Sequence, residues 1–315
     1  MNKICLVYPW FGKFNSYFDL WLSSAMNNQS IDFLIYTSSD NEQYIKQRFN
    51  LTSNIYIYIY SLKEISSRIG KICGKSILIK RPYKLCDYKP LYCFIFDEIS
   101  SYDFWGFGDM DVVLGDIRKF ITDDVLSKND VIGHAGHMQI FKNCKEINEL
   151  VLKTPSLTFK KILCDQERNY FFDEREFSRF NLYNSNRKSL ISSFVADIRP
   201  ASRKLGLKYF RFTFRGGAEE KHKKQCFWYS GGNLYSVYFA NGWHMHEILY
   251  VHFQKRSMKN LVNDVSKNYL CIPNRFVLCD KREDISKKYK FYLSDFLKSL
   301  WKNRRSYIKH FLYRK

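Results

Sequence analysis

The sequence predicts an α/β fold built around a mainly parallel sheet, and three observations support this prediction. Short apolar segments typical of buried strands alternate with segments that repeat apolar residues at helical spacing. Aromatic residues make up 18% of the chain, and the Ile-Tyr-Ile-Tyr-Ile-Tyr run at 55–60 favours a strand. A content of 45% apolar and 26% charged residues is typical of a folded globular protein. We therefore expect a β-containing core flanked by helices.

The first third of the chain carries the evidence for parallel strands. Residues 4–8 are typical of a buried strand, 9–15 of a loop, 16–27 of an amphipathic helix and 32–37 of a second strand. A strand, a helix and a strand in this order make a βαβ unit, which implies parallel pairing. The next predicted elements are a helix at 41–49, a strand at 54–60, a helix at 62–70, a helical stretch within 82–99 and a strand at 103–107.

The pattern becomes less regular in the rest of the chain. Another element begins at 116–120, and two short strands flank the sequence Gly-His-Ala-Gly-His that starts at Gly133. Because no repeat or low-complexity linker marks a boundary, we expect residues 1–275 to form one compact domain and 276–315 a separate basic segment. The remaining predicted elements are short strands at 130–133 and 138–141, helical pieces near 145–170 and strand-like runs at 207–214, 225–229 and 247–253.

The composition narrows the possible location of the protein. The apolar run at the N-terminus meets Pro9 too early for a signal peptide, and no uninterrupted apolar stretch reaches the roughly 18 residues of a membrane span. The nine cysteines include no Cys-x-x-Cys pair, which argues against a disulfide framework and against a thiolate zinc site. We therefore expect a cytoplasmic protein with buried thiols.

The net charge of +20 calls for an anionic partner, and much of it lies at the C-terminus. Residues 287–315 hold ten Lys or Arg and a single acid, Asp295. Apolar residues recur among them at helical spacing, which is typical of a basic amphipathic helix at an anionic membrane surface. Binding to nucleic acid and packing onto the protein's own core are the alternatives.

Two carboxylates mark the most informative point of the sequence. Asp109 and Asp111 follow directly on the strand at 103–107, and alternate residues of an extended segment project to the same side. Carboxylate oxygens suit Mg²⁺ or Mn²⁺, and ligands of open α/β sheets bind beyond the carboxyl ends of the strands. The alternative is a simple turn, in which Asp is common.

Two segments, one before these carboxylates and one that contains them, together resemble a known family. They are Arg-Pro-Tyr-Lys-Leu-Cys-Asp-Tyr-Lys-Pro at 81–90 and Tyr-Asp-Phe-Trp-Gly-Phe-Gly-Asp-Met-Asp-Val-Val-Leu-Gly-Asp-Ile-Arg-Lys-Phe at 102–120. In this combination the chain resembles bacterial glycosyltransferases of the GT-A fold from lipopolysaccharide and capsule gene clusters, including the DUF6625 group. The resemblance extends from Pro9 to the His-Phe-Gln-Lys-Arg segment that begins at His252.

The resemblance implies a function. It implies a GT-A-like α/β domain that acts as a hexosyltransferase. The enzyme would move a sugar from a nucleotide donor, a UDP-sugar above all, to a lipid-linked or growing cell-surface polysaccharide. The reaction would take place at the inner face of the cytoplasmic membrane, with the basic C-terminal segment bound to the membrane surface. No nucleic-acid partner is expected.

The resemblance also implies the ligands of a metal ion. Asp109 and Asp111 would hold Mn²⁺ or Mg²⁺ against the diphosphate of the donor, where the cation offsets charge on the leaving group. His252 would supply a third ligand, although the family follows this histidine with Gly and Lys-Pro, which this chain lacks. His244 and His246 compete for the same role.

The resemblance implies other site residues as well. Asp173 and Glu174 would be the acidic pair near the acceptor, one of them a general base in an inverting enzyme; the alternative is a solvated helix face among Arg168, Arg175 and Arg179. Lys84 and Asp87 would bind the nucleotide; the alternative for them is a salt bridge between neighbours on a helix. Turn chemistry alone could explain the glycines beside His134 and His137. The donor-binding residues would be Pro9, Phe11, Gly12, Lys84, Asp87, Lys89, Asp109 and Lys255.

Two other classes of function compete with this interpretation. A non-catalytic basic protein would bind nucleic acid with steep salt dependence and would not need Asp109 or Asp111. A sugar nucleotidyltransferase would need a glycine-rich phosphate loop near the N-terminus, where the segment 9–15 has a single glycine. The sequence leaves open the donor sugar and base, the acceptor and linkage, the stereochemical outcome, the general base and the oligomeric state.

Overall fold

The computed structural model describes residues 1–153, 156–175, 177, 188–189, 192–199, 212, 225–254, 256 and 258–290. The chain divides into two compact units, each described by itself. The first unit comprises Met1–Val112 and Asp116–Phe194, and the second comprises Val113–Gly115 and the chain from Val195 onward. Neither boundary coincides with the one expected at residue 275, and that boundary stays a prediction.

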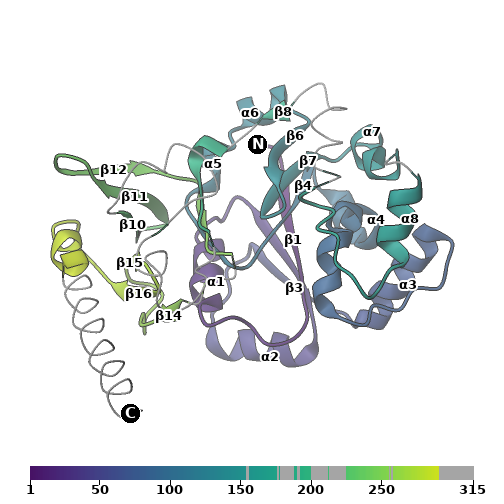
Figure 1. The fold of residues 1–315 in the computed structure, drawn as a ribbon, viewed down its shortest axis with the longest axis horizontal. Helices are drawn as coiled ribbons and strands as arrows, with labels where there is room; N and C mark the ends of the chain where they lie inside the picture. Colours follow the sequence, from purple (N-terminus) through teal and green to yellow (C-terminus); the bar gives the residue numbers. More distant parts are fainter. Residues whose placement is uncertain are drawn as a thin grey trace, which may run out of the picture. The chain divides into compact units, whose positions relative to one another are not determined.

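The first unit contains a seven-stranded sheet in the order β3-β2-β1-β4-β7-β6-β8 (Figure 1). The four strands β3, β2, β1 and β4 are parallel to one another, whereas β7 is antiparallel to both β4 and β6. The predicted α/β fold with a mainly parallel sheet is therefore confirmed. The strands are β1 (Ile4–Trp10), β2 (Asp32–Thr37), β3 (Ile55–Ile59), β4 (Phe104–Gly108), β6 (Val131–Ala135), β7 (Met138–Lys142) and β8 (Lys188–Ser189).

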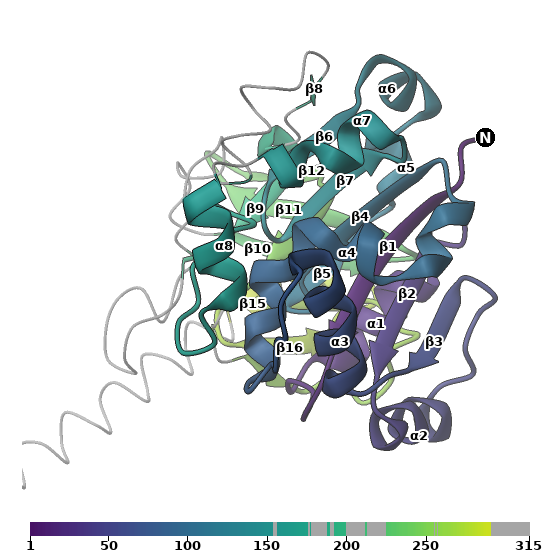
Figure 2. The same ribbon diagram turned by 90° about the vertical axis from the view of Figure 1, so that its right-hand side faces the viewer.

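Helices cover both faces of this sheet (Figures 1 and 2). On one face, Val7 and Leu34 belong to a buried apolar cluster with Ile69 of α3, Tyr88 of η1 and Ile162 of α8. On the opposite face, the rings of Tyr8 and Trp21 of α1 meet edge to face at 4.9 Å. The helices are α1 (Phe18–Met26), α2 (Ser39–Arg48), α3 (Leu62–Cys73), η1 (Pro82–Leu91), α4 (Tyr92–Ile95), η2 (Asp97–Ser101), α5 (Ile117–Phe120), α6 (Asp123–Lys128), α7 (Lys145–Asn148), η3 (Glu149–Lys153), α8 (Ser156–Cys164) and η4 (Ser192–Phe194).

The local sequence explains where two of these helices begin and end. α3 starts with a capping box between Ser61 and Glu64 and ends at Gly74, whose φ of 62° suits a glycine. The helical stretch expected within 82–99 differs from the prediction. It is a 3₁₀ helix, a single α-helical turn and a second 3₁₀ helix. Phe96 separates the last two, because it is extended and its ring stacks on Tyr36 at 3.7 Å.

The second unit contains two sheets. The larger sheet has the order β12-β11-β10-β15-β16-β14, and the smaller has the order β5-β13-β9. One face of the larger sheet buries Trp228 and Leu270 against Ile285 and Tyr289, which follow the last strand. The strands are β5 (Val112–Leu114), β9 (Val195–Asp197), β10 (Gln225–Ser230), β11 (Asn233–Phe239), β12 (Trp243–Glu247), β13 (Tyr250–His252), β14 (Lys259–Asn260), β15 (Tyr269–Ile272) and β16 (Arg275–Leu278).

Two sequence predictions fall partly outside the described residues. The strand-like run at 207–214 is described only at Phe212, and the basic segment is described only as far as residue 290. β16 spans the expected boundary at 275 and pairs with β15. None of the helices in the described part of the chain is long and apolar enough to cross a membrane.

Candidate active site

The Asp-Met-Asp segment lies at the carboxyl end of β4, as the sequence predicted. β4 ends at Gly108, and the backbone N–H of Asp109 donates to the carbonyl of His137 at 3.2 Å. Met110 between the two carboxylates is buried, and its carbonyl accepts a hydrogen bond from the Asn15 side chain at 3.3 Å. The loop after β1 and the turn before β7 therefore fix this segment in place.

A buried lysine holds one of these carboxylates. The Lys89 ammonium lies 2.6 Å from Oδ1 of Asp109, 2.9 Å from Oδ2 of Asp173 and 2.8 Å from the carbonyl of Gly136. Its side chain is only 6% exposed, so these three acceptors use its three N–H groups. Lys89 thus joins η1, the end of β4, the turn between β6 and β7 and the segment that follows α8.

Two carboxylates of this cluster bind the same ammonium. Burial lowers the pKa of Lys89, but the carboxylates of Asp109 and Asp173 outweigh this effect and hold the pKa well above its ordinary value. Burial raises the pKa of Asp173 to about 6, and Lys89 opposes that rise. A ligand atom of Asp111 lies within 4.8 Å of one of Asp109, and such a pair of carboxylate oxygens suits a divalent cation.

Gly136 allows this close packing. A Cβ atom at this position would lie 2.5 Å from Oδ2 of Asp173 and 2.5 Å from Cγ of Glu174. Turn chemistry is one explanation for a glycine at this position, and the close approach of the Asp173 carboxylate is therefore a second. His137 is buried beside it, Gly133 has a φ of 81°, and the side chain of His134 lies outside the described residues.

The two residues of the predicted acidic pair have different surroundings. Asp173 is buried against Lys89, whereas Glu174 is exposed. Arg175 lies over the ring of Phe171 at 5.2 Å. Arg179, from the solvated face considered as the alternative, lies outside the described residues.

Lys84 and Asp87 form an ion pair inside the first unit. Their charged atoms are 2.8 Å apart, and both side chains are fully buried. The Lys84 ammonium also donates to the carbonyls of Ile162 at 2.8 Å and Arg168 at 3.0 Å, which uses its three N–H groups. A nucleotide would have to displace these bonds to reach either side chain. The alternative considered above, a salt bridge between neighbours on a helix, is therefore present, and it is buried and not on the surface.

The loop after β1 lies at the same edge of the sheet as Asp109. Gly12, at the tip of this loop, has a φ of 105° and accepts hydrogen bonds from the Asn41 side chain and the Trp10 indole. The ring of Phe14 stacks on Phe18 at 3.7 Å. Pro9 and Phe11, on either side of Trp10, are half-buried. Of the predicted donor residues, Phe11 and Gly12 thus belong to this aromatic loop, whereas Pro9, expected in the loop, lies near the end of β1.

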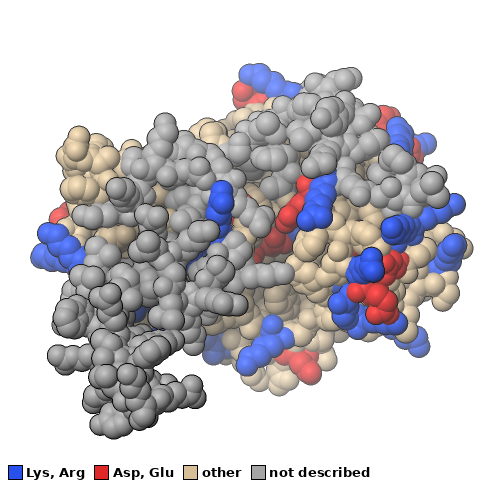
Figure 3. All heavy atoms as spheres, viewed as in Figure 1, with Lys and Arg blue, Asp and Glu red and all other residues tan. Residues whose placement is uncertain are grey.

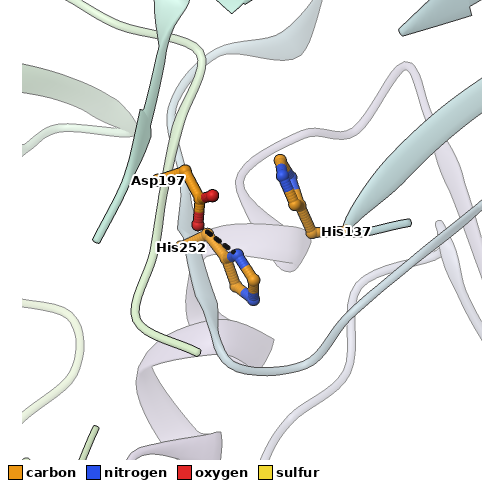
Figure 4. A group of neighbouring side chains, drawn as sticks. All are labelled: His137, Asp197 and His252. Atoms are coloured by element: carbon orange, nitrogen blue, oxygen red, sulfur yellow. Dashed lines mark hydrogen bonds and ion pairs between the residues drawn. The ribbon is translucent and has the colours of Figure 1, made fainter. Parts of the chain in front are cut away.

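His252 lies at the end of β13 in the second unit and is 5% exposed. Its Nδ1 lies 2.9 Å from Oδ1 of Asp197 (Figure 4). Gln254 donates to the same oxygen at 2.8 Å. A carboxylate on Nδ1 fixes the tautomer in which Nε2 carries the lone pair, as in many metal-bound histidines. Lys255 lies outside the described residues.

The two competing histidines have other surroundings. His244 and His246 are exposed on β12, with their rings 5.4 Å and 5.8 Å from that of Tyr238. His244 Nε2 lies 2.8 Å from the carbonyl of Ala240. Among the three histidines, only His252 is buried against a carboxylate. Sequence reasoning missed Asp197, because 55 residues separate it from His252.

Solved structures of two glycosyltransferases are distantly similar to this chain. An active-site mutant of LgtC shares 14% identity at a TM-score of 0.36, and the match covers 61% of this chain and 75% of LgtC. The galactosyltransferase LgtC in complex with donor and acceptor sugar analogs shares 13% identity at the same score and coverage. GlyE from Streptococcus pneumoniae TIGR4 shares 13% identity at a TM-score of 0.35, over 62% of this chain and 46% of GlyE.

Sequence comparisons give a family but no characterised relative. A search of curated proteins finds no match to this chain. The predicted resemblance to the DUF6625 group is confirmed by a match over residues 6–280, and the chain belongs to the DUF6625 family, a family of unknown function.

Proposed function

We propose that this protein is a metal-dependent glycosyltransferase that moves a sugar from a nucleotide donor, a UDP-sugar above all, to a lipid-linked or growing cell-surface polysaccharide. The observation that carries the proposal is the buried Lys89 ammonium between Asp109 and Asp173. This cluster lies at the carboxyl end of β4, the edge of an α/β sheet at which ligands bind. Carboxylate oxygens at this edge suit a divalent cation or a ligand that carries one.

The residues of the site fit a hard divalent cation. Asp109 and Asp111 would hold Mn²⁺ or Mg²⁺ through carboxylate oxygens, with His252 as the proposed third ligand. When bound, the cation would supply Lewis-acid stabilisation of the departing nucleotide diphosphate. The hydrogen bond of His252 to Asp197 supports its proposed role, because it orients the ring and fixes its tautomer.

The protein's own side chains would prepare the site for the donor. Lys89 orients the Asp109 carboxylate and keeps a positive charge beside it while the site is without a cation. We assign Pro9, Phe11, Gly12 and Lys255 to the donor side, the first three because they lie at the end of β1 and in the loop that follows it, at the same sheet edge.

The acceptor side depends on Asp173 and Glu174. A general base must reach the incoming hydroxyl, so the exposed Glu174 suits that role better than Asp173, whose carboxylate is bound by Lys89. We propose that Asp173 contributes through its contact with Lys89 and that Glu174 is the candidate base.

One face of the described surface bears on the nucleic-acid alternative. On the face drawn in Figure 3, acidic side chains lie between the basic ones instead of leaving a continuous basic stripe. A groove for nucleic acid would present one sign of charge along its length.

Thermal-shift measurements with nucleoside diphosphates, with and without Mn²⁺, test the proposal. We expect one nucleotide to raise Tm of the wild type only when Mn²⁺ is present, and to have no effect on Asp111→Ala. Asp124→Ala is the matched control, because it removes an exposed carboxylate of α6 whose ion pair with Lys128 is also exposed. If no nucleotide stabilises the wild type in a metal-dependent way, or if Asp111→Ala responds equally, the proposal fails.

We also propose that the basic C-terminal segment binds the inner face of the cytoplasmic membrane in a bacterium. The ten basic residues of 287–315 and the Trp and Phe among them support this, since such segments bind anionic lipid surfaces. Flotation with vesicles of anionic lipid, on the full chain and on a chain truncated before Lys287, is the test. Equal recovery of both proteins with the vesicles would contradict the proposal.

A further inference from the structure

We infer that Lys84 and Asp87 are positioning residues. They hold the backbone of residues 168–172 so that the next residue, Asp173, meets Lys89. The catalytic consequence of this inference rests on the proposed function, whereas its structural part does not.

The contacts of the pair reach both ends of one short segment. On one side, Lys84 donates to the carbonyls of Ile162, at the end of α8, and Arg168. On the other side, the carboxylate of Asp87 accepts the backbone N–H groups of Tyr170, at 3.0 and 3.1 Å, and of Phe172, at 3.2 Å. The last of these bonds lies one residue before Asp173, so the pair fixes the backbone directly next to that carboxylate.

The geometry of η1 places the Lys84–Asp87 pair and Lys89 in one element. In a 3₁₀ helix, residues three apart lie on the same side, which places Lys84 and Asp87 side by side. Lys89 follows Asp87 by two residues in the same helix. One rigid element therefore holds the backbone beside Asp173 and the ammonium that binds the Asp173 carboxylate. Tyr88, between them, donates to the carbonyl of Leu163 at 2.7 Å.

Burial distinguishes this pair from an exposed ion pair nearby in the structure. Lys80 and Glu167 also form an ion pair, but their side chains are 58% and 73% exposed, so water screens it. Lys84 and Asp87 are fully buried, and removal of either would leave the other charge without compensation. The buried Lys84–Asp87 pair should control the position of the segment, and the exposed Lys80–Glu167 pair should not.

Trypsin cleavage tests the structural part, whatever the function of the protein. The Arg168 side chain is exposed, but its carbonyl, part of the bond that trypsin cuts, is bound by Lys84. We expect cleavage after Arg168, followed by mass spectrometry on the full chain, to be about tenfold faster in Asp87→Asn and Lys84→Met, because local opening exposes the bond. Lys80→Ala, which removes only the exposed pair, should cleave at the wild-type rate.

A double variant guards against failure to fold. Lys84→Met with Asp87→Leu replaces the ion pair by apolar side chains of similar volume, a change that buried pairs often tolerate. It still removes the acceptor for the N–H groups of Tyr170 and Phe172, so we expect the same faster cleavage. A wild-type rate of cleavage in this folded double variant would overturn the inference.

The catalytic part predicts a split between binding and turnover. If the pair positions Asp173, then Asp87→Asn should bind the nucleoside diphosphate and Mn²⁺ as the wild type does, but should turn over the sugar donor about tenfold more slowly. If Lys84 and Asp87 contacted the nucleotide themselves, binding would weaken instead, and the inference would be wrong. Faster trypsin cleavage without any metal-dependent nucleotide binding would support the positioning role and reject the proposed function.

Discussion

Lys84 and Lys89 lie five residues apart in one 3₁₀ helix, and both are buried, yet their surroundings differ. Lys84 binds one carboxylate and two backbone carbonyls, so a single pair of opposite charges is enclosed. Lys89 binds two carboxylates and one carbonyl, and one of these carboxylates belongs to the Asp-Met-Asp segment. The Lys84 pair completes a structural contact, whereas Lys89 holds a carboxylate to which we assign a metal-binding role.

The largest expected effect comes from Lys89→Met. Two carboxylates lose their common partner, so the free energy of unfolding at pH 7 should fall by about 3–5 kcal/mol, measured by urea denaturation. Added Mn²⁺ should restore part of this loss, because a cation can replace the ammonium. Lys84→Met should lose a similar amount without any recovery in Mn²⁺. Equal recovery in both variants would remove the distinction between the two lysines.

Gly136→Ala should have a smaller effect on the same cluster. The added carbon would lie 2.5 Å from the Asp173 carboxylate, which must shift, so we expect a loss of about 1–3 kcal/mol on denaturation and slower donor turnover. Gly74→Ala is the control, because its φ of 62° strains an alanine but nothing lies within 4 Å of the added carbon. The control should lose stability without a change in turnover; a slower control would point to a global effect.

The pH dependence of stability should reveal the raised pKa of Asp173. Because burial raises this pKa to about 6, the folded protein binds the proton more tightly than the unfolded chain does. Its contribution to stability is therefore present at low pH and is lost as the pH rises through 6. Relative to Asp173→Asn, the wild type should gain about 1 kcal/mol between pH 7 and pH 5 in denaturation experiments. Parallel pH profiles of the two proteins would contradict this assignment.

The smallest effect should come from Lys80→Ala. Its ion pair with Glu167 is exposed on both sides, and such pairs contribute little because water screens them. We expect no measurable change in Tm. A clear fall in Tm would mean that the outer contacts, and not only the buried pair, hold the segment before Asp173.

Local pattern predicted the parallel sheet and the place of Asp109 and Asp111. Both depend on residues close in sequence: the alternation of strands and helices, and two carboxylates directly after an apolar strand. The exposed or buried state of the lysines could not be predicted in this way. Lysine is almost never fully buried unless it is paired, and nothing in the sequence marks Lys84 as one of the exceptions.

The long-range partners were also beyond sequence reasoning. Lys89 meets Asp173, and His252 meets Asp197, across 84 and 55 residues respectively. No periodicity links residues so far apart, since tertiary packing alone decides these contacts. The resemblance to glycosyltransferases drew attention to Lys89, Asp173 and His252 but not to the pairs that they form. The mainly antiparallel sheet of the second unit was likewise predicted only as isolated aromatic runs.

Binding of Mn²⁺ tests the central claim most directly. The electron paramagnetic resonance signal of free Mn²⁺ would be followed while wild type or Asp111→Asn is added in the presence of a UDP-sugar. We predict that the wild type removes about one Mn²⁺ per chain from solution and that Asp111→Asn removes far less, because a hard cation needs both carboxylates. Equal depletion by the two proteins, or none by the wild type, would contradict a metal site at Asp109 and Asp111.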